Sequence, residues 1–134
     1  MVGVVLVTHP HLGEEFIRSA ELIAGKLPQL TTVSINTLKG VEELRRDVAE
    51  AIKRVDLGQG VLILTDMFGG TPSNMSLAFL REDRVEVLTG LNLPMMIAIS
   101  NCRQGRTLRD LAKMVKEAGQ RSINLASEIL QKKS

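Results

Sequence analysis

VVLVTH at residues 4–9 and VLILTD at residues 61–66 are the two stretches that decide the fold. Both runs are almost entirely apolar and rich in branched side chains, which is typical of strands buried on both faces of a parallel sheet. Each run ends in Thr followed by an ionisable residue, His9 in the first and Asp66 in the second. The two runs therefore predict a histidine and an aspartate at the carboxyl-terminal edge of a buried sheet.

Strand and helix patterns alternate outward from these two runs, and we expect a single domain over residues 1–134. Alternation indicates an α/β fold, in which a doubly wound, mostly parallel sheet carries helices on both faces. Right-handed crossovers predict the strand order 2-1-3-4, which makes the strands ending in His9 and Asp66 neighbours. The predicted elements are strands at 2–8, 31–36, 60–66 and 84–90, and helices at 12–27, 41–55, 72–82 and 107–118.

Two segments remain open at this level. Residues 94–100 fit either a buried strand or a helix that begins at Pro94, because periodicity alone does not separate the two. Residues 121–130 fit a short edge strand, the end of a helix, or an arm that packs on another subunit.

The composition excludes several classes of function. With three Phe and no Trp or Tyr, the chain has few of the aromatic rings on which bases or flavins stack, which argues against such functions. The net charge of +2 is too small to indicate a nucleic-acid partner or a membrane surface. Cys102 is the only cysteine, and the amino terminus has no export-signal pattern or long apolar segment. We therefore expect a cytoplasmic protein without direct membrane insertion.

The pairing of His9 with Asp66 predicts phosphoryl chemistry. An imidazole accepts a phosphoryl group only through an unprotonated ring nitrogen. A carboxylate that is hydrogen-bonded to the other nitrogen orients the ring and stabilises the positive charge that develops on it. We therefore predict that His9 accepts the phosphoryl group and that Asp66 orients and polarises it.

The turn after Asp66 supplies the second half of the predicted site. Gly69 and Gly70 permit close backbone approach, Thr71 is predicted as the N-cap of a helix, and Pro72 as its first residue. Free backbone N–H groups at such a helix start attract phosphate. We therefore expect Gly69, Gly70 and Thr71 to bind the phosphoryl group, and we expect no metal and no cofactor.

One alternative acceptor and one group of basic residues also have to be considered. His11, which follows Pro10, is an alternative phosphoryl acceptor near the start of the first helix. The basic residues Arg103, Arg106, Arg109, Lys113 and Lys116 have spacings of three and four that indicate the solvated face of one helix.

Three blocks of the sequence resemble the mannose-type enzyme IIA components of the bacterial phosphoenolpyruvate-dependent sugar phosphotransferase system. They are VVLVTH at 4–9, LTDMFGGTPSN at 64–74 and TGLNLPM at 89–95, in the same order as in that family. The resemblance covers essentially the whole chain. It implies a doubly wound α/β domain and favours a helix for residues 94–100.

The resemblance also implies a phosphocarrier and its partners. The residue matching His9 takes phosphate from the histidine phosphocarrier protein and passes it to a histidine on a mannose-type enzyme IIB. The carboxylate matching Asp66 orients the ring, and the hydroxyl matching Thr71 helps to hold the phosphate. Such proteins dimerise, some by exchanging a C-terminal edge strand, which would give residues 121–130 a role. A homodimer with a possible antiparallel edge strand is therefore implied.

The chain departs from the family pattern at two places. Pro10 and His11 follow the histidine where the family commonly has Gly, and no IIB domain follows before Ser134, so we expect a separate IIB chain as acceptor. Two alternative functions stay open. One is the phosphoryl-donor subunit of a dihydroxyacetone kinase, a family that lacks the FGGTP block. The other is a regulatory IIA whose partner binding depends on phosphorylation.

Overall fold

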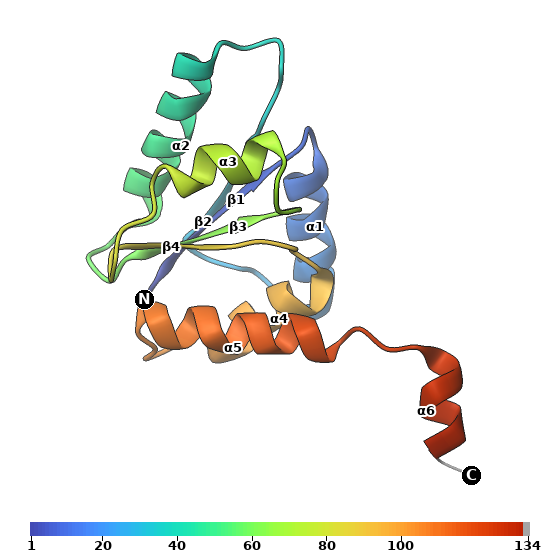
Figure 1. Ribbon diagram of the computed structural model, residues 1–134. Helices are drawn as coiled ribbons and strands as arrows, with labels where there is room; N and C mark the ends of the chain where they lie inside the picture. The colour runs from blue at the N-terminus through green and yellow to red at the C-terminus, as the bar shows by residue number, and fades with distance from the viewer. Residues whose placement is uncertain (133–134) are drawn as a thin grey trace.

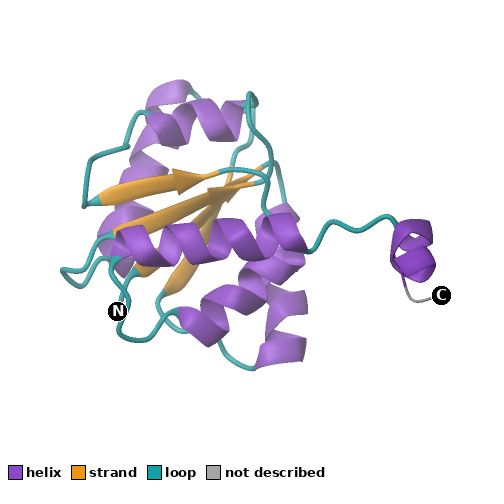
Figure 2. Ribbon diagram, turned by 60° about the horizontal axis from the view of Figure 1, so that its bottom comes forward, coloured by secondary structure: helices purple, strands orange, loops and turns teal. Residues whose placement is uncertain are grey.

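The computed structural model describes residues 1–132 and contains a four-stranded sheet between two layers of helices (Figure 1, Figure 2). The strands lie in the order β2-β1-β3-β4 and all neighbours are parallel, which confirms the predicted fold class. In chain order the elements are β1 (Gly3–Thr8), α1 (Leu12–Ala24), β2 (Leu30–Ser34), α2 (Val41–Val55), β3 (Val61–Thr65), α3 (Thr71–Leu77), β4 (Val85–Leu88), α4 (Leu93–Cys102), α5 (Leu108–Arg121) and α6 (Ala126–Lys132).

The central strands β1 and β3 are buried along their whole length, as their continuous apolar runs predict. In their register Gly3 pairs with Val61 and Val7 with Thr65. Because the paired strands end within one residue of each other, the next residue of each chain segment, His9 or Asp66, emerges at the same edge of the sheet.

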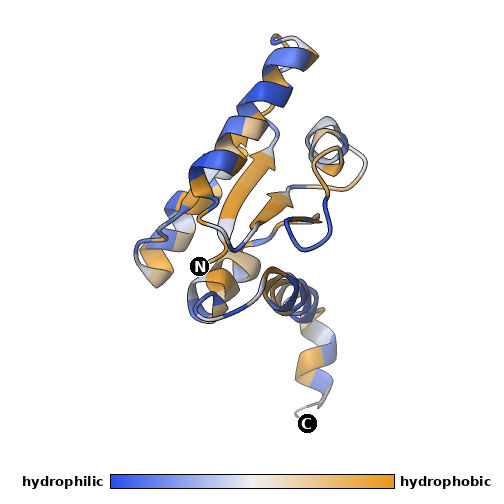
Figure 3. Cartoon of the chain, turned by 90° about the vertical axis from the view of Figure 1, so that its left-hand side faces the viewer, coloured by the Kyte–Doolittle hydropathy of each residue, from blue (hydrophilic) through white to orange (hydrophobic). Residues whose placement is uncertain are grey.

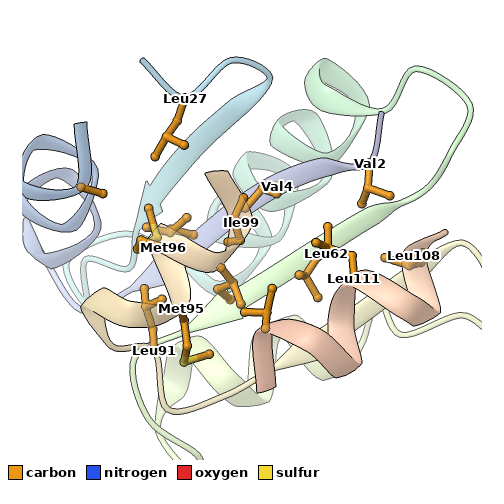
Figure 4. Close-up of a cluster of buried hydrophobic side chains, with 14 residues drawn as sticks. Val2, Val4, Leu27, Leu62, Leu91, Met95, Met96, Ile99, Leu108 and Leu111 are labelled. Atoms are coloured by element: carbon orange, nitrogen blue, oxygen red, sulfur yellow. The ribbon is translucent and has the colours of Figure 1, made fainter. Parts of the chain in front are cut away.

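Two aliphatic clusters hold the helices against the sheet. One cluster joins β1 and β3 to α1, α4 and α5, and Figure 4 shows Met95, Met96 and Ile99 of α4 among its side chains. The other cluster joins the opposite face to α2, with Met75 and Phe79 packed against it from α3 and the residues after it. The hydrophobic colour of the strands and the mixed colour of the helices show this layering (Figure 3).

The structure decides the ambiguous segment around Pro94. Residues 93–102 form helix α4, whose N-cap Asn92 accepts a hydrogen bond from the Met95 backbone N–H at 3.1 Å. The expectation from the family resemblance is therefore confirmed. No helix among the described residues has the length and apolarity needed to cross a membrane.

Helix α3 is shorter than predicted. It ends at Leu77 instead of continuing to residue 82. Arg81 instead forms an isolated antiparallel bridge with Val85, and Asp83 adopts a left-handed backbone with φ 61°. The chain must turn here to enter β4, and this tight pairing over four residues takes the place of the last turn of the predicted helix.

Of the alternatives for residues 121–130, the possible edge strand is not formed, because α5 ends at Arg121 and residues 126–132 form the short helix α6. This helix and the loop before it stand away from the rest of the domain (Figure 1, Figure 2). Ile123, Leu125 and Leu130 are exposed on this segment. We call residues 122–132 the C-terminal arm.

Arg103 is the clearest error of the pattern-based interpretation. Arg103 is only 3% exposed, whereas a position on a solvated helix face was expected. The guanidinium donates hydrogen bonds to the backbone carbonyls of Val2 at 2.8 Å, Gln29 at 2.5 Å and Pro28. These carbonyls lie just before β1 and β2, so Arg103 closes the amino-terminal edge of the sheet.

Candidate functional site

His9 and Asp66 meet at the carboxyl-terminal edge of the sheet although 57 positions separate them in the sequence. The ring atom Nδ1 of His9 lies 2.7 Å from Oδ2 of Asp66, and the His9 backbone N–H donates to the same oxygen at 3.0 Å. The second carboxylate oxygen accepts the backbone N–H of Met67 at 3.0 Å. Asp66 is therefore held on both oxygens, and it holds His9 by both backbone and ring.

The protonation of this pair follows from its hydrogen bonds. Burial on its own would raise the pKa of Asp66, but hydrogen bonds from the backbone and ring of His9 outweigh it and hold the pKa below its ordinary value. The carboxylate is therefore ionised at neutral pH and can only accept, so Nδ1 of His9 carries the proton. The lone pair of the neutral ring consequently resides on Nε2.

Exposure differs sharply between the two partners. The side chain of His9 is 48% exposed, whereas that of Asp66 is 9% exposed. A reagent from solvent thus reaches the imidazole but hardly touches the carboxylate. This asymmetry suits a reactive ring that is oriented from behind by a protected charge.

Gly70 lies against the His9 ring. A Cβ atom at position 70 would lie 3.2 Å from Cε1 and 3.7 Å from Nε2 of His9. The missing side chain therefore leaves room on the side of the ring that carries the lone pair. The prediction singled out Gly70 for phosphate binding and did not anticipate this contact with the ring.

The predicted cap of the following helix is corrected by one residue. Gly70 is the N-cap of α3, with an extended backbone at φ −88° and ψ 174°, and Thr71 is the first helical residue. The carbonyl of Gly70 accepts the first helical hydrogen bond, from the N–H of Asn74 at 3.0 Å. Thr71 is exposed, and its hydroxyl makes no hydrogen bond within residues 1–132. Gly69, directly before Gly70, has a left-handed backbone with φ 91°.

His11 is placed differently from His9. Its backbone is left-handed, with φ 66°, and it forms the N-cap of α1. Its side chain is 86% exposed, and its nearest carboxylate is Glu14 at 3.9 Å. Among the described residues no buried group orients this ring, in contrast to the ring of His9.

An apolar surface borders the site. Met67 and Phe68, which follow Asp66, are exposed. Leu12 is also exposed, and with Phe16 and Leu93 it lines a shallow hollow of about 190 Å³. Large apolar side chains around a polar centre are typical of surfaces that meet another protein. Within residues 1–132, no cluster of three or more His, Cys, Asp or Glu side chains is arranged to hold a metal ion.

Thr8 has a place at the site that pattern reading missed. Its hydroxyl lies between the carbonyl of His9 and the backbone N–H of Gly13, at 2.8 and 2.9 Å. The signal in the sequence is a threonine directly before the histidine with a glycine five residues later. That pattern is too common to identify a function without the coordinates.

Comparison with known families gives a match over most of the chain. The family model described as the PTS system fructose IIA component matches residues 3–116. The fructose-specific EIIA component of Bacillus subtilis (strain 168) is 31% identical over 133 residues, which cover 98% of this chain and 91% of that protein.

Solved structures agree with this match. The phosphotransferase system component EIIA from Streptococcus agalactiae has a TM-score of 0.85 at 26% identity and covers 96% of this chain and 99% of its own. The mannose/sorbose-specific IIA subunit from Enterococcus faecalis has a TM-score of 0.82 at 26% identity, with 92% and 93% covered. The chain therefore belongs to the mannose-type EIIA family of the sugar phosphotransferase system.

Proposed function

We propose that this protein is a phosphohistidine carrier, which accepts a phosphoryl group on His9 and passes it on to a histidine of a separate enzyme IIB. The single observation that carries the proposal is the hydrogen bond of 2.7 Å between His9 Nδ1 and Asp66 Oδ2. It leaves Nε2 as the nucleophilic atom of a ring whose side chain is 48% exposed. Membership of the EIIA family supports the same chemistry.

The proposed transfer exchanges one N–P bond for another. The bond between phosphorus and the histidine of the donor breaks, and a bond between phosphorus and Nε2 of His9 forms. The ring becomes positively charged as it reacts, and the ionised Asp66 stabilises that charge through the Nδ1 proton. Because bond types on the two sides are alike, transfer to the next histidine reverses the same step.

Gly69, Gly70 and Thr71 are proposed to bind the phosphoryl oxygens. The contact of Gly70 with the ring brings this turn beside Nε2. Within the described residues, the Thr71 hydroxyl has no competing hydrogen bond, so it is available as a donor. The support is geometric: there is space beside His9 Nε2, and hydrogen-bond donors of the turn lie next to that space.

The proposed partners are the histidine phosphocarrier protein as donor and a mannose-type enzyme IIB as acceptor, both cytoplasmic. The exposed side chains of Met67, Phe68 and Leu12 provide an apolar surface around His9 on which both can dock in turn. One surface suffices, because a carrier that holds one phosphoryl group meets its partners one at a time.

A homodimer is also proposed, with the C-terminal arm as the contact. Its exposed Ile123, Leu125 and Leu130 would be covered by a second copy. We expect replacement of Ile123 and Leu130 by Asp to shift the protein from dimer to monomer in light scattering. A wild-type protein that is monomeric at all concentrations would refute the dimer.

The test of the main proposal is incubation with phosphoenolpyruvate, enzyme I and the histidine phosphocarrier protein, followed by mapping of acid-labile phosphate. We expect label on His9, complete loss of label in His9→Ala, and retention of label in His11→Ala. Label that survives His9→Ala would overturn the assignment. Addition of a mannose-type IIB should then discharge the phosphorylated protein, whereas a purely regulatory IIA would stay loaded.

A further inference from the structure

Thr8 is the last residue of β1 and is 0% exposed, so it touches neither solvent nor a docked protein. Its hydroxyl nevertheless makes two hydrogen bonds, with the His9 carbonyl at 2.8 Å and with the Gly13 backbone N–H at 2.9 Å. The hydroxyl thus links the reactive residue to the first turn of α1.

The direction of both bonds is determined by chemistry. A backbone N–H can only donate, so the Gly13 amide gives its hydrogen to the Thr8 oxygen. The single hydroxyl hydrogen is then free to be donated to the carbonyl of His9. That carbonyl has one other partner, the N–H of Leu12, at a longer distance of 3.3 Å.

The close approach of α1 depends on Gly13. A Cβ atom at this position would lie 2.1 Å from Oγ1 of Thr32 and 3.2 Å from Oγ1 of Thr8. Only glycine therefore lets the helix start settle onto β1 and β2 at the distance where its amide reaches Thr8. The hydrogen bond between the Gly13 amide and the Thr8 hydroxyl therefore requires both residues.

We propose that Thr8 is a positioning residue for phosphoryl transfer, which holds the His9 backbone from its carbonyl side while Asp66 holds it from its amide side. The inference rests on the proposed role of His9. Asp66 accepts from both the backbone and the ring of His9 with one oxygen. That single oxygen acts as a pivot, and the Thr8 contact prevents the residue from turning about it.

The experiment measures phosphoryl transfer from the phosphorylated histidine phosphocarrier protein, with kcat and KM determined separately for folded variants. Thr8→Val removes the hydroxyl at nearly constant shape, and Thr8→Ser restores it. Thr65→Val is the matched control, because Thr65 ends the neighbouring strand β3, is also 0% exposed, and has a hydroxyl without a partner among the described residues.

We expect kcat of Thr8→Val to fall roughly tenfold or more with KM unchanged, since small displacements of a reacting group are costly. Thr8→Ser and Thr65→Val should keep kcat near the wild-type value. The ¹⁵N signals of the His9 ring should show one ordered tautomer in the wild type and in Thr65→Val, and averaged signals in Thr8→Val.

Wild-type kcat in folded Thr8→Val would overturn the proposal, and so would a change confined to KM. If Thr8→Val does not fold, Thr8→Cys replaces it, because a thiol fills similar space but donates a hydrogen bond only weakly. In that case, a kcat and His9 ring signals equal to those of the wild type would refute the role of Thr8. Absence of label on His9 in the wild type would instead refute the carrier function itself, so the two failures are distinguishable.

Discussion

At each end of the sheet, one charged or ionisable side chain is hydrogen-bonded to a segment that is distant in the sequence. The two side chains differ in how far they are exposed and in whether an atom is left unpaired. At the carboxyl-terminal edge, His9 is half exposed and keeps one ring nitrogen free beside a buried carboxylate. At the amino-terminal edge, Arg103 is buried and donates to three backbone carbonyls. The comparison teaches that hydrogen bonding alone does not separate a candidate reactive group from a structural one, whereas the accessibility of an unpaired atom does.

The amino-terminal edge should respond only in stability. Replacing Arg103 by Met removes three hydrogen bonds to backbone carbonyls, of which that of Gln29 keeps the N–H of Val4, and we expect a loss of roughly 3 kcal/mol in the free energy of unfolding. Phosphoryl transfer by the folded fraction should stay at the wild-type rate. Denaturant unfolding and the transfer assay measure the two effects, with the exposed Arg106→Met as control. A folded Arg103→Met with slow transfer would break the separation of the two edges.

The carboxyl-terminal edge should respond mainly in rate. Asp66→Asn keeps the shape of the side chain but removes the charge that fixes the ring tautomer, and we expect transfer to His9 to slow by roughly a hundredfold. Single-turnover kinetics with the phosphorylated donor measure this. Asp56→Asn serves as control, because Asp56 is exposed at the opposite edge and only accepts the N–H of Gly58. Equal rates in the two variants would contradict the assignment.

Room beside the ring can be tested at Gly70. Gly70→Ala places a methyl group 3.2 Å from His9 Cε1, and we expect transfer to slow by roughly tenfold while stability hardly changes. Gly40→Ala is a matched control: Gly40 is also an N-cap with extended backbone, at φ −70° and ψ 157°, but its added Cβ meets nothing within 4 Å. If both variants transfer at the wild-type rate, the space beside the ring is unimportant.

The weakest expected effect is on stability in acid. Because the pKa of Asp66 is lower in the folded protein, its contribution to stability is complete above the ordinary value of 3.8 and disappears as pH falls through the folded-state value. The difference in unfolding free energy between wild type and Asp66→Asn should therefore shrink below about pH 4. Thermal unfolding at a series of pH values measures it. A difference that grows as the pH falls would have the wrong sign.

Most of the site could be predicted because it rests on strand order. The buried runs that end in His9 and Asp66 identify two parallel strands, and general rules of winding make those strands neighbours. The position of the helix cap and the length of α3 could not be predicted. Gly70 lies against the ring of His9, a contact between segments far apart in the chain. Helix α3 gives way to the short-range bridge between Arg81 and Val85, which turns the chain into β4.

Arg103 and Thr8 show where pattern reading fails for a different reason. The spacing of Arg103 with other basic residues indicates solvent, and nothing local reports the three carbonyls that surround it. Thr8 looks like any strand residue of moderate polarity. Its two hydrogen bonds exist only because the start of α1 returns to the end of β1.

The sequence by itself determined the alternation of strands and helices, the aliphatic core, and the convergence of a histidine and a carboxylate, since all three follow from local hydrophobic pattern and from rules of chain winding. Only the tertiary structure decided that residues 93–102 are helical, that the segment at 126–132 is a helix on a projecting arm, and which atoms surround the imidazole. The helix at 93–102 and the surroundings of the imidazole depend on contacts between segments far apart in the chain, and the free energies of such contacts are not written in any single stretch of residues. The arm stands away from the domain, and its helical conformation is a local choice that the sequence pattern left open.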